Sequence, residues 1–334
     1  MKIEQPSSSA QKSKPVIDRG RKPTSSLSGQ SSSLISSLFS STVPGTPIAG
    51  TSMVTIARPK AKAIVVLHGL DGSGKTTFVT RFCPDPITLI NCDRRAEEAA
   101  YSDAENYGRT INYLDAALPA DIADYSPEDS KALAEYILYD RIKPDLIWSL
   151  NNGVRTIGLD TAFEYTRILN YAFRGHPIKQ KPTKEDPGDF GAADRAINEE
   201  IWWLVNKIRE NRNVNLVILS RSKEEHDGQK PLGTYRPDCH KIFHQACDWS
   251  GFLSLTSEEE MTERLLAESG TNSLTTSQMR KIKTRRPFEL KITKGGQAIE
   301  EMGKTYGEGE WGEDGPFAYS CSRLIPRTTV EDWK

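Results

Sequence analysis

The sequence has little cysteine, and it lacks long apolar runs. Five cysteines occur in 334 residues, at positions 83, 92, 239, 247 and 321. Such sparse, irregular spacing excludes a small secreted module held together by disulfides, so we expect a reducing, cytoplasmic compartment. No stretch of 18 or more apolar residues occurs, so we expect neither a membrane-spanning segment nor a signal peptide, and no membrane partner.

The chain also has very little net charge, formally -1, with 44 Lys+Arg against 45 Asp+Glu. This balance excludes a uniformly basic surface but hides local excesses. Residues 1–62 hold nine basic and two acidic residues, and the run from Arg280 to Arg286 (RKIKTRR) holds five basic residues in seven. Such a run can contact single-stranded DNA through its phosphates, with little sequence preference. A solvated charged face is the alternative for the same residues.

Composition divides the chain into three parts. Residues 1–60 are rich in serine, with 15 in the first 52 positions, and cannot bury enough apolar area to offset their ordering entropy. We expect a disordered basic tail there, followed by one domain over 61–295. Residues 296–334 are expected to form a second tail, because from about Gly303 the sequence YGEGEWGEDG is typical of a loop or a mobile end.

Short apolar runs rich in β-branched residues alternate with segments of helical spacing. The expected strands are Ala63–Leu67, Ile87–Asn91, Thr156–Leu159, Val214–Ser220 and a shorter one at Gly251–Leu255. The expected helices include one beginning at Thr76–Phe82, one over Pro127–Arg141 and one over Ala192–Asn211. Continuous apolar strands joined through helices predict an α/β fold, with a mostly parallel sheet and helices on both faces.

The segment from Gly69 to Thr77 reads GLDGSGKTT and fits the pattern G-x4-G-K-[ST] between a strand and a helix. We call it the phosphate loop. Its glycines allow successive backbone N–H groups to converge on phosphate oxygens. In this pattern Lys75 reaches the β- and γ-phosphates, and the Thr76 hydroxyl ligates Mg²⁺. The loop predicts a P-loop NTPase that binds ATP and Mg²⁺ through Gly69, Asp71, Gly72, Ser73, Gly74, Lys75, Thr76 and Thr77.

Several polar residues follow the predicted strands. Asp160 ends the strand TIGLD, at the edge where open α/β sheets bind ligands, and we expect it to hold Mg²⁺ together with Thr76. A helix cap is the alternative role for Asp160. Glu164 and Asp93 are the two candidates for the catalytic base that orients the attacking water.

The fourth predicted strand ends at Ser220 and is followed by Arg221 and Lys223. Ser220 is a candidate sensor of the γ-phosphate, and either cation could stabilise charge that develops on it. Ordinary solvated loop charges are the alternative.

Cys239, His240, His244 and Cys247 fall within nine residues, a spacing compatible with zinc. The neighbouring apolar residues favour instead an amphipathic helix with its histidines at the border, and both possibilities stay open.

These residues resemble RecA-like P-loop ATPases of the kind carried by phages, a group of AAA-type NTP-binding domains that includes single-strand annealing and recombination proteins. The resemblance covers about residues 60–295 and depends on the order GLDGSGKTT, the strand ending at Asp93, TIGLD, EEIWWLVNKIRE, VNLVILSR and ACDWSGFLSL. It implies that the strand ending at Ser220 lies between the phosphate-loop strand and the Asp160 strand. It also implies homo-oligomeric rings or filaments, with ATP at the subunit interface. The chain departs from the family in having Arg221 where many members have His, and Asp93 where Glu is frequent.

The resemblance implies an ATP-hydrolysing protein that acts on single-stranded DNA in recombination or replication. The same loop is also similar to those of nucleoside monophosphate kinases, and Asp93-Arg94 resembles their base-binding pair, although no Arg-rich lid follows. A small GTPase is disfavoured, because SRSK follows the fourth strand where N-K-x-D is required. An ATP-dependent switch with a protein partner is the third possibility.

Overall fold

The computed structural model describes residues 62–94, 96–177, 191–211, 213–256, 258–270, 273–279, 287–295 and 298–334. The predicted tail over 1–60 and the basic run from Arg280 to Arg286 lie outside these described residues. Within the described part, no helix has the length and apolar character needed to cross a membrane.

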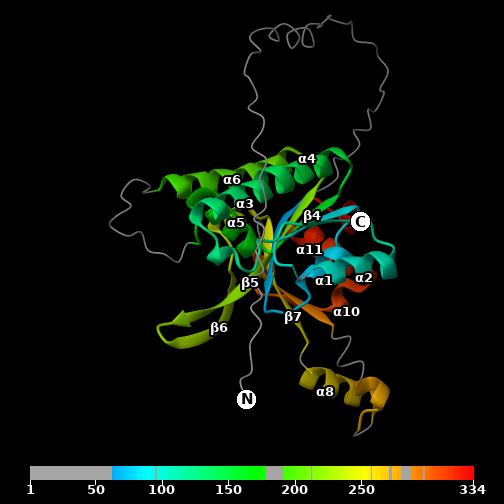
Figure 1. Cartoon of the computed structure of the whole chain (residues 1–334). Helices are drawn as coiled ribbons and strands as arrows, with labels where there is room; N and C mark the ends of the chain where they lie inside the picture. Colours follow the sequence, from blue (N-terminus) through cyan, green and yellow to red (C-terminus); the bar gives the residue numbers. More distant parts are fainter. Residues whose placement is uncertain are drawn as a thin grey trace, which may run out of the picture. The chain divides into compact units, whose positions relative to one another are not determined.

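Nine strands of the described residues form one sheet (Figure 1). They are β1 (Ile64–Gly69), β2 (Ile87–Asn91), β3 (Ile111–Asp115), β4 (Thr156–Asp160), β5 (Asn215–Asp227), β6 (Lys230–Pro237), β7 (Trp249–Leu255), β8 (Phe288–Lys294) and β9 (Thr305–Tyr306). The order is β3-β2-β4-β5-β1-β7-β8-β9, with β6 paired to β5. Along this order, the neighbouring strands β3, β2, β4, β5, β1 and β7 pair in parallel. The other three pairs are antiparallel: β6 with β5, β8 with β7 and β9 with β8. The expected position of β5, between β1 and β4, is confirmed.

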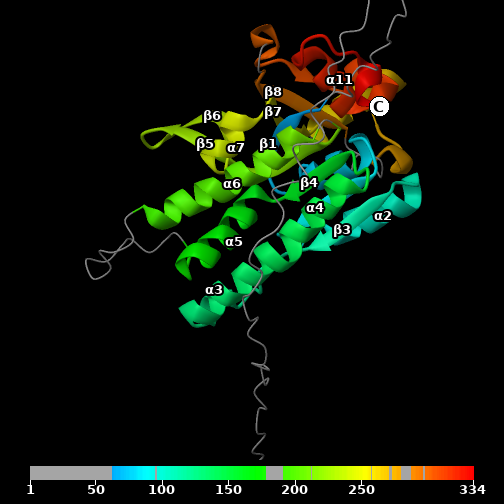
Figure 2. The ribbon, with the colours of Figure 1, turned by 90° about the horizontal axis from the view of Figure 1, so that it is seen from above.

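Helices cover both faces of the sheet (Figures 1 and 2). They are α1 (Lys75–Phe82), α2 (Glu97–Tyr107), α3 (Pro127–Tyr136), α4 (Lys143–Asn151), α5 (Ala162–Arg174), α6 (Ala192–Glu210), α7 (Lys241–Ala246), α8 (Glu258–Ser269), α10 (Glu308–Trp311) and α11 (Gly315–Leu324). Short helical turns lie at η1 (Ile122–Asp124), η3 (Ile299–Glu301), η4 (Gly312–Asp314) and η5 (Val330–Trp333), and a π-helix, η2 (Ile137–Ile142), joins α3 to α4.

Two apolar clusters fill the space between sheet and helices, because successive strand residues point to opposite faces. In β1, Ile64 and Val66 belong to the cluster under α3 to α7, while Val65 and Leu67 belong to the cluster under α1 and α11. The predicted α/β architecture, with a mostly parallel sheet between two helical layers, is thus confirmed.

The residues after Gly303 are packed, so the expectation of a loop or mobile end is wrong for them. Phe317 and Cys321 of α11 are fully buried, and Trp249 of β7 donates its indole N–H to the Cys321 sulfur at 3.3 Å. Trp333 is only 1% exposed. The acidic glycine-rich segment is followed by an apolar helix, and that helix supplies the core contacts. These residues belong to the same compact unit as the rest of the described chain, Ala57–Lys334.

Candidate functional site

The phosphate loop joins the end of β1 to the start of α1. Gly72 and Gly74 have φ angles of 77° and 83°, in the left-handed region that favours glycine. A Cβ atom at Gly74 would lie 2.0 Å from Cε1 of Phe288, at the start of β8, so the loop requires glycine there for packing as well. The backbone therefore follows the path that the motif predicts, and the Phe288 side chain of β8 packs against the loop at Gly74.

The Lys75 side chain folds back into the phosphate loop. Its Nζ donates to the carbonyl oxygens of Gly69 and Leu70, at 3.0 and 2.8 Å. Burial lowers the pKa of Lys75, while the nearby carboxylates of Asp160 and Asp71 oppose that shift. The ammonium group thus lies within the loop, bonded to neutral oxygens that an anion could replace.

Thr76 and Asp160 meet across the sheet edge. The Thr76 hydroxyl donates to Oδ2 of Asp160 at 2.7 Å, although the two residues are 84 positions apart. Asp160 is 5% exposed, and its burial raises its pKa to about 6. Asp93 adds to this rise, whereas the Thr76 hydrogen bond and the Lys75 charge oppose it. A hydroxyl and a carboxylate side by side are hard oxygen donors of the kind that Mg²⁺ prefers, so these residues fit the expected ion.

Arg221 connects the phosphate loop to the end of β2. Its guanidinium lies 3.6 Å from the Asp93 carboxylate and 3.9 Å from that of Asp71. It also lies 5.9 Å from the centre of the Phe163 ring, at the start of α5. The Arg221 Nε is buried without a hydrogen-bond partner in the described structure. A cation held between two carboxylates therefore borders the site.

The two candidate bases occupy different surroundings. Asp93 is among the charges that shift the pKa of both Lys75 and Asp160. Glu164, in the first turn of α5, pairs with Arg167 one turn later at 3.2 Å, and its backbone N–H is capped by the Thr161 hydroxyl. Asp93 thus lies in the electrostatic environment of Lys75 and Asp160, while Glu164 contacts its own helix.

Other polar residues of this region have internal partners. The Ser220 hydroxyl donates to the carbonyl oxygen of Arg221 at 2.8 Å, and Lys223 pairs with Asp238 at 2.6 Å. Sequence reasoning missed His68, which is fully buried in β1 just before the loop. Its ring nitrogens bond Ser222 and Thr293, at 2.9 and 3.1 Å, and burial lowers its pKa to about 4. A single polar residue between the apolar run and the phosphate loop was the available signal. The neutral ring links β1 to β5 and β8.

Around α7, His240 caps the helix by accepting from the Ile242 N–H, and the Cys247 thiol donates to the His244 carbonyl oxygen. Among the residues that the structure describes, no group of three or more His, Cys, Asp or Glu side chains is arranged to hold a metal ion.

A family model described as "AAA domain" matches residues 61–286, most of the chain and the whole phosphate loop. The chain belongs to the AAA domain family. No curated protein matches this AAA domain chain. Among solved structures, the crystal structure of the RadB recombinase is similar over 73% of this chain and 86% of that chain, at 9% identity and a TM-score of 0.36. A similarity of that level carries no information on function.

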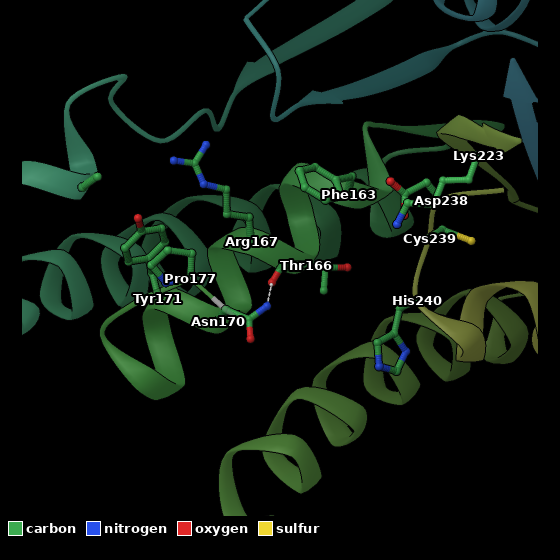
Figure 3. Close-up of a pocket in the computed structure, with 11 residues that line it drawn as sticks. Phe163, Thr166, Arg167, Asn170, Tyr171, Pro177, Lys223, Asp238, Cys239 and His240 are labelled. Carbon is green, nitrogen blue, oxygen red and sulfur yellow. Dashed lines mark hydrogen bonds and ion pairs between the residues drawn. The ribbon is translucent and has the colours of Figure 1, made fainter. Parts of the chain in front are cut away.

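The AAA domain also has a cavity of about 620 Å³ beside the site, along α5 (Figure 3). Phe163, Thr166 and Asn170 line one side, and His240 lies opposite, before α7. Phe163 is shared with the contact to Arg221, so the cavity and the phosphate-loop region adjoin through one aromatic ring.

Proposed function

We propose that this AAA domain protein binds ATP with Mg²⁺ and hydrolyses it, as a RecA-like ATPase of the phage type that acts on single-stranded DNA in recombination or replication. The observation that carries the proposal is the 2.7 Å contact between the Thr76 hydroxyl and the Asp160 carboxylate, beside Lys75. This trio lies at the carboxyl edge of the parallel strands, where α/β sheets bind ligands.

In this proposal the phosphate loop supplies the nucleotide contacts. The Lys75 ammonium, now bonded to the carbonyls of Gly69 and Leu70, would exchange those bonds for phosphate oxygens. Thr76 and Asp160 would hold Mg²⁺. When bound, that ion neutralises charge on the β- and γ-phosphates.

We assign Asp93 as the residue that orients the attacking water, with Glu164 as the second candidate. Asp93 has a nearly buried carboxylate, 15% exposed, and it acts electrostatically on both Lys75 and Asp160. The neighbouring Arg221 guanidinium, which lies beside Asp93 and Asp71, carries a positive charge that suits the charge developing on the transferred phosphoryl group.

For DNA contact we propose the basic run from Arg280 to Arg286. This run directly precedes Pro287 and Phe288 in the sequence, and the Phe288 ring lies against Gly74 of the phosphate loop. DNA binding at this basic run and nucleotide binding at the phosphate loop would then be linked through β8. We further propose that the protein works in the cytoplasm of the producing or host cell, as a ring or filament with ATP between subunits.

The test is phosphate release from ATP by the full chain, with and without single-stranded DNA. We expect release that rises when DNA is added and a DNA affinity that falls steeply with salt. Transfer of the γ-phosphate to dTMP would instead establish a nucleoside monophosphate kinase and refute the proposal.

A further inference from the structure

A buried histidine, His68, lies within the sheet directly before the phosphate loop. It is fully buried in β1, although the four residues before it, Ile64–Leu67, are all apolar. Both ring nitrogens are bonded, Nδ1 to the Ser222 hydroxyl at 2.9 Å and Nε2 to the Thr293 hydroxyl at 3.1 Å. A buried hydrogen-bonded group adds little stability over an apolar side chain of the same shape, but a fully satisfied network specifies one arrangement. The bonds of His68 therefore fix the residues that they reach.

The bond to Ser222 reaches the point where β5 leaves the parallel part of the sheet. Leu219 is the last β5 residue that pairs with β4, and Arg221 is the last that pairs with β1. From Ser222 onward, β5 pairs with β6 in a two-stranded hairpin that extends away from the helices and the other strands (Figure 1). Ser222 is thus the first residue of the hairpin, and the His68 ring of β1 holds it to the sheet.

The second strand of the hairpin is connected to the same ring through two aromatic side chains. Phe252 of β7 contacts the His68 ring edge-on, with the ring centroids 5.5 Å apart. Tyr235 of β6 stacks on Phe252 at 5.0 Å, with an angle of 12° between the rings. Burial lowers the pKa of His68 to about 4, so the ring is neutral at pH 7 and its contacts do not change near that pH. His68 therefore anchors both strands of the hairpin.

The bond to Ser222 also determines the orientation of Arg221. Neighbouring residues of a strand point to opposite faces, so holding Ser222 toward His68 on one face directs Arg221 to the other. The Arg221 guanidinium lies 3.6 Å from the Asp93 carboxylate and 3.9 Å from that of Asp71 in the phosphate loop. If Ser222 were released, β5 would be free to rotate where it leaves β1, and the guanidinium would lose this placement.

We propose that His68 is a positioning residue for Arg221 and that it acts through its hydrogen bond to Ser222. This inference rests on the proposed function, in which Arg221 stabilises charge that develops on the transferred phosphoryl group. The His68 ring is fully buried and both of its nitrogens are bonded within the protein, so it does not contact ATP itself. Loss of the Ser222 bond should therefore lower the rate of hydrolysis and leave ATP affinity, which the phosphate loop supplies, nearly unchanged.

The experiment compares Ser222→Ala with Thr293→Val, because each variant removes one hydrogen bond of the His68 ring and only Ser222 adjoins Arg221. Ser222→Ala should slow single-turnover ATP hydrolysis about tenfold, as expected for one lost hydrogen bond, and keep ATP affinity within about twofold. Thr293→Val is the matched control and should keep the rate within about twofold of the wild type. In an Arg221→Ala background, Ser222→Ala should have no further effect on the rate, since the group that it positions is gone.

A second measurement reports the placement of Arg221 without ATP. The Nε–H signal of Arg221 in a heteronuclear NMR spectrum, identified by its absence from Arg221→Lys, should shift in Ser222→Ala and in His68→Phe and stay in place in Thr293→Val. The inference is wrong if this signal is unchanged in Ser222→Ala, if Ser222→Ala hydrolyses ATP as fast as Thr293→Val, or if its effect adds in full to that of Arg221→Ala. A wild type that releases no phosphate from ATP would refute the proposed function, and the Arg221 signal would still decide whether His68 positions Arg221.

Discussion

Replacing Gly74 by alanine should destabilise the protein more than the same replacement at Gly72. Both residues have left-handed φ angles, 83° and 77°, which cost a non-glycine residue about 1–2 kcal/mol. A Cβ at Gly72 meets no atom within 4 Å, but at Gly74 it lies 2.0 Å from the Phe288 ring. Moving that ring adds an overpacking cost of about 1–3 kcal/mol. We therefore expect a loss of about 1–2 kcal/mol for Gly72→Ala and about 2–5 kcal/mol for Gly74→Ala.

The free energy of unfolding, measured by urea denaturation, tests this difference. Phe288→Leu supplies the control, because it shortens the group that the new Cβ meets. In a double-mutant cycle, Phe288→Leu should recover most of the excess cost of Gly74→Ala and none of the cost of Gly72→Ala. Equal losses for the two glycines, or no coupling between Gly74 and Phe288, would refute the packing described for the phosphate loop.

Three further predictions concern charged residues. Because the folded pKa of Asp160 is about 6 against an ordinary 3.8, the wild type should lose stability as pH rises from about 4 to 6, by at most about 3 kcal/mol. Urea denaturation should find Asp160→Asn more stable than the wild type at pH 7.5 and equal to it below pH 4; a constant difference would contradict the raised pKa. Asp93→Asn should slow single-turnover ATP hydrolysis about 100-fold and Glu164→Gln less than about threefold, and the reverse ranking would make Glu164 the base. Arg221→Ala should slow hydrolysis about 100-fold with ATP affinity within about threefold, and a loss confined to affinity would exclude a role in the transition state.

The strands buried on both faces could be predicted because their apolar runs are continuous. The predicted bounds of β2 match the structure, and β4 ends at Asp160, one residue beyond the predicted end at Leu159. β3 (INYLD) and β8 (FELKITK) were missed, since both mix polar and apolar residues. β8 pairs antiparallel with β7 and buries Leu290 and Ile292 on alternate positions, a weaker pattern than a continuous run.

The phosphate loop could be located from sequence because its backbone geometry requires glycine at fixed spacing. The Arg221 contacts to Asp71 and Asp93 could not be found in the same way, because three separate segments meet only through the strand order. The cavity along α5 could not be predicted either, because most of its lining residues come from two separate parts of the sequence, α5 and the chain that follows α6. Composition gave a wrong prediction at the C-terminus, because the acidic glycine-rich segment is typical of a loop, whereas α11 directly after it has a buried apolar face.

The most direct test of ATP hydrolysis at the phosphate loop is steady-state phosphate release by Lys75→Ala beside the wild type. Lys207→Ala serves as the matched control, because Lys207 lies on α6 and pairs with Glu210 away from the loop. We predict that Lys75→Ala reduces phosphate release to background with or without single-stranded DNA, and that Lys207→Ala retains wild-type rates. Phosphate release by Lys75→Ala at the wild-type rate would contradict the assignment of this loop as the site of hydrolysis.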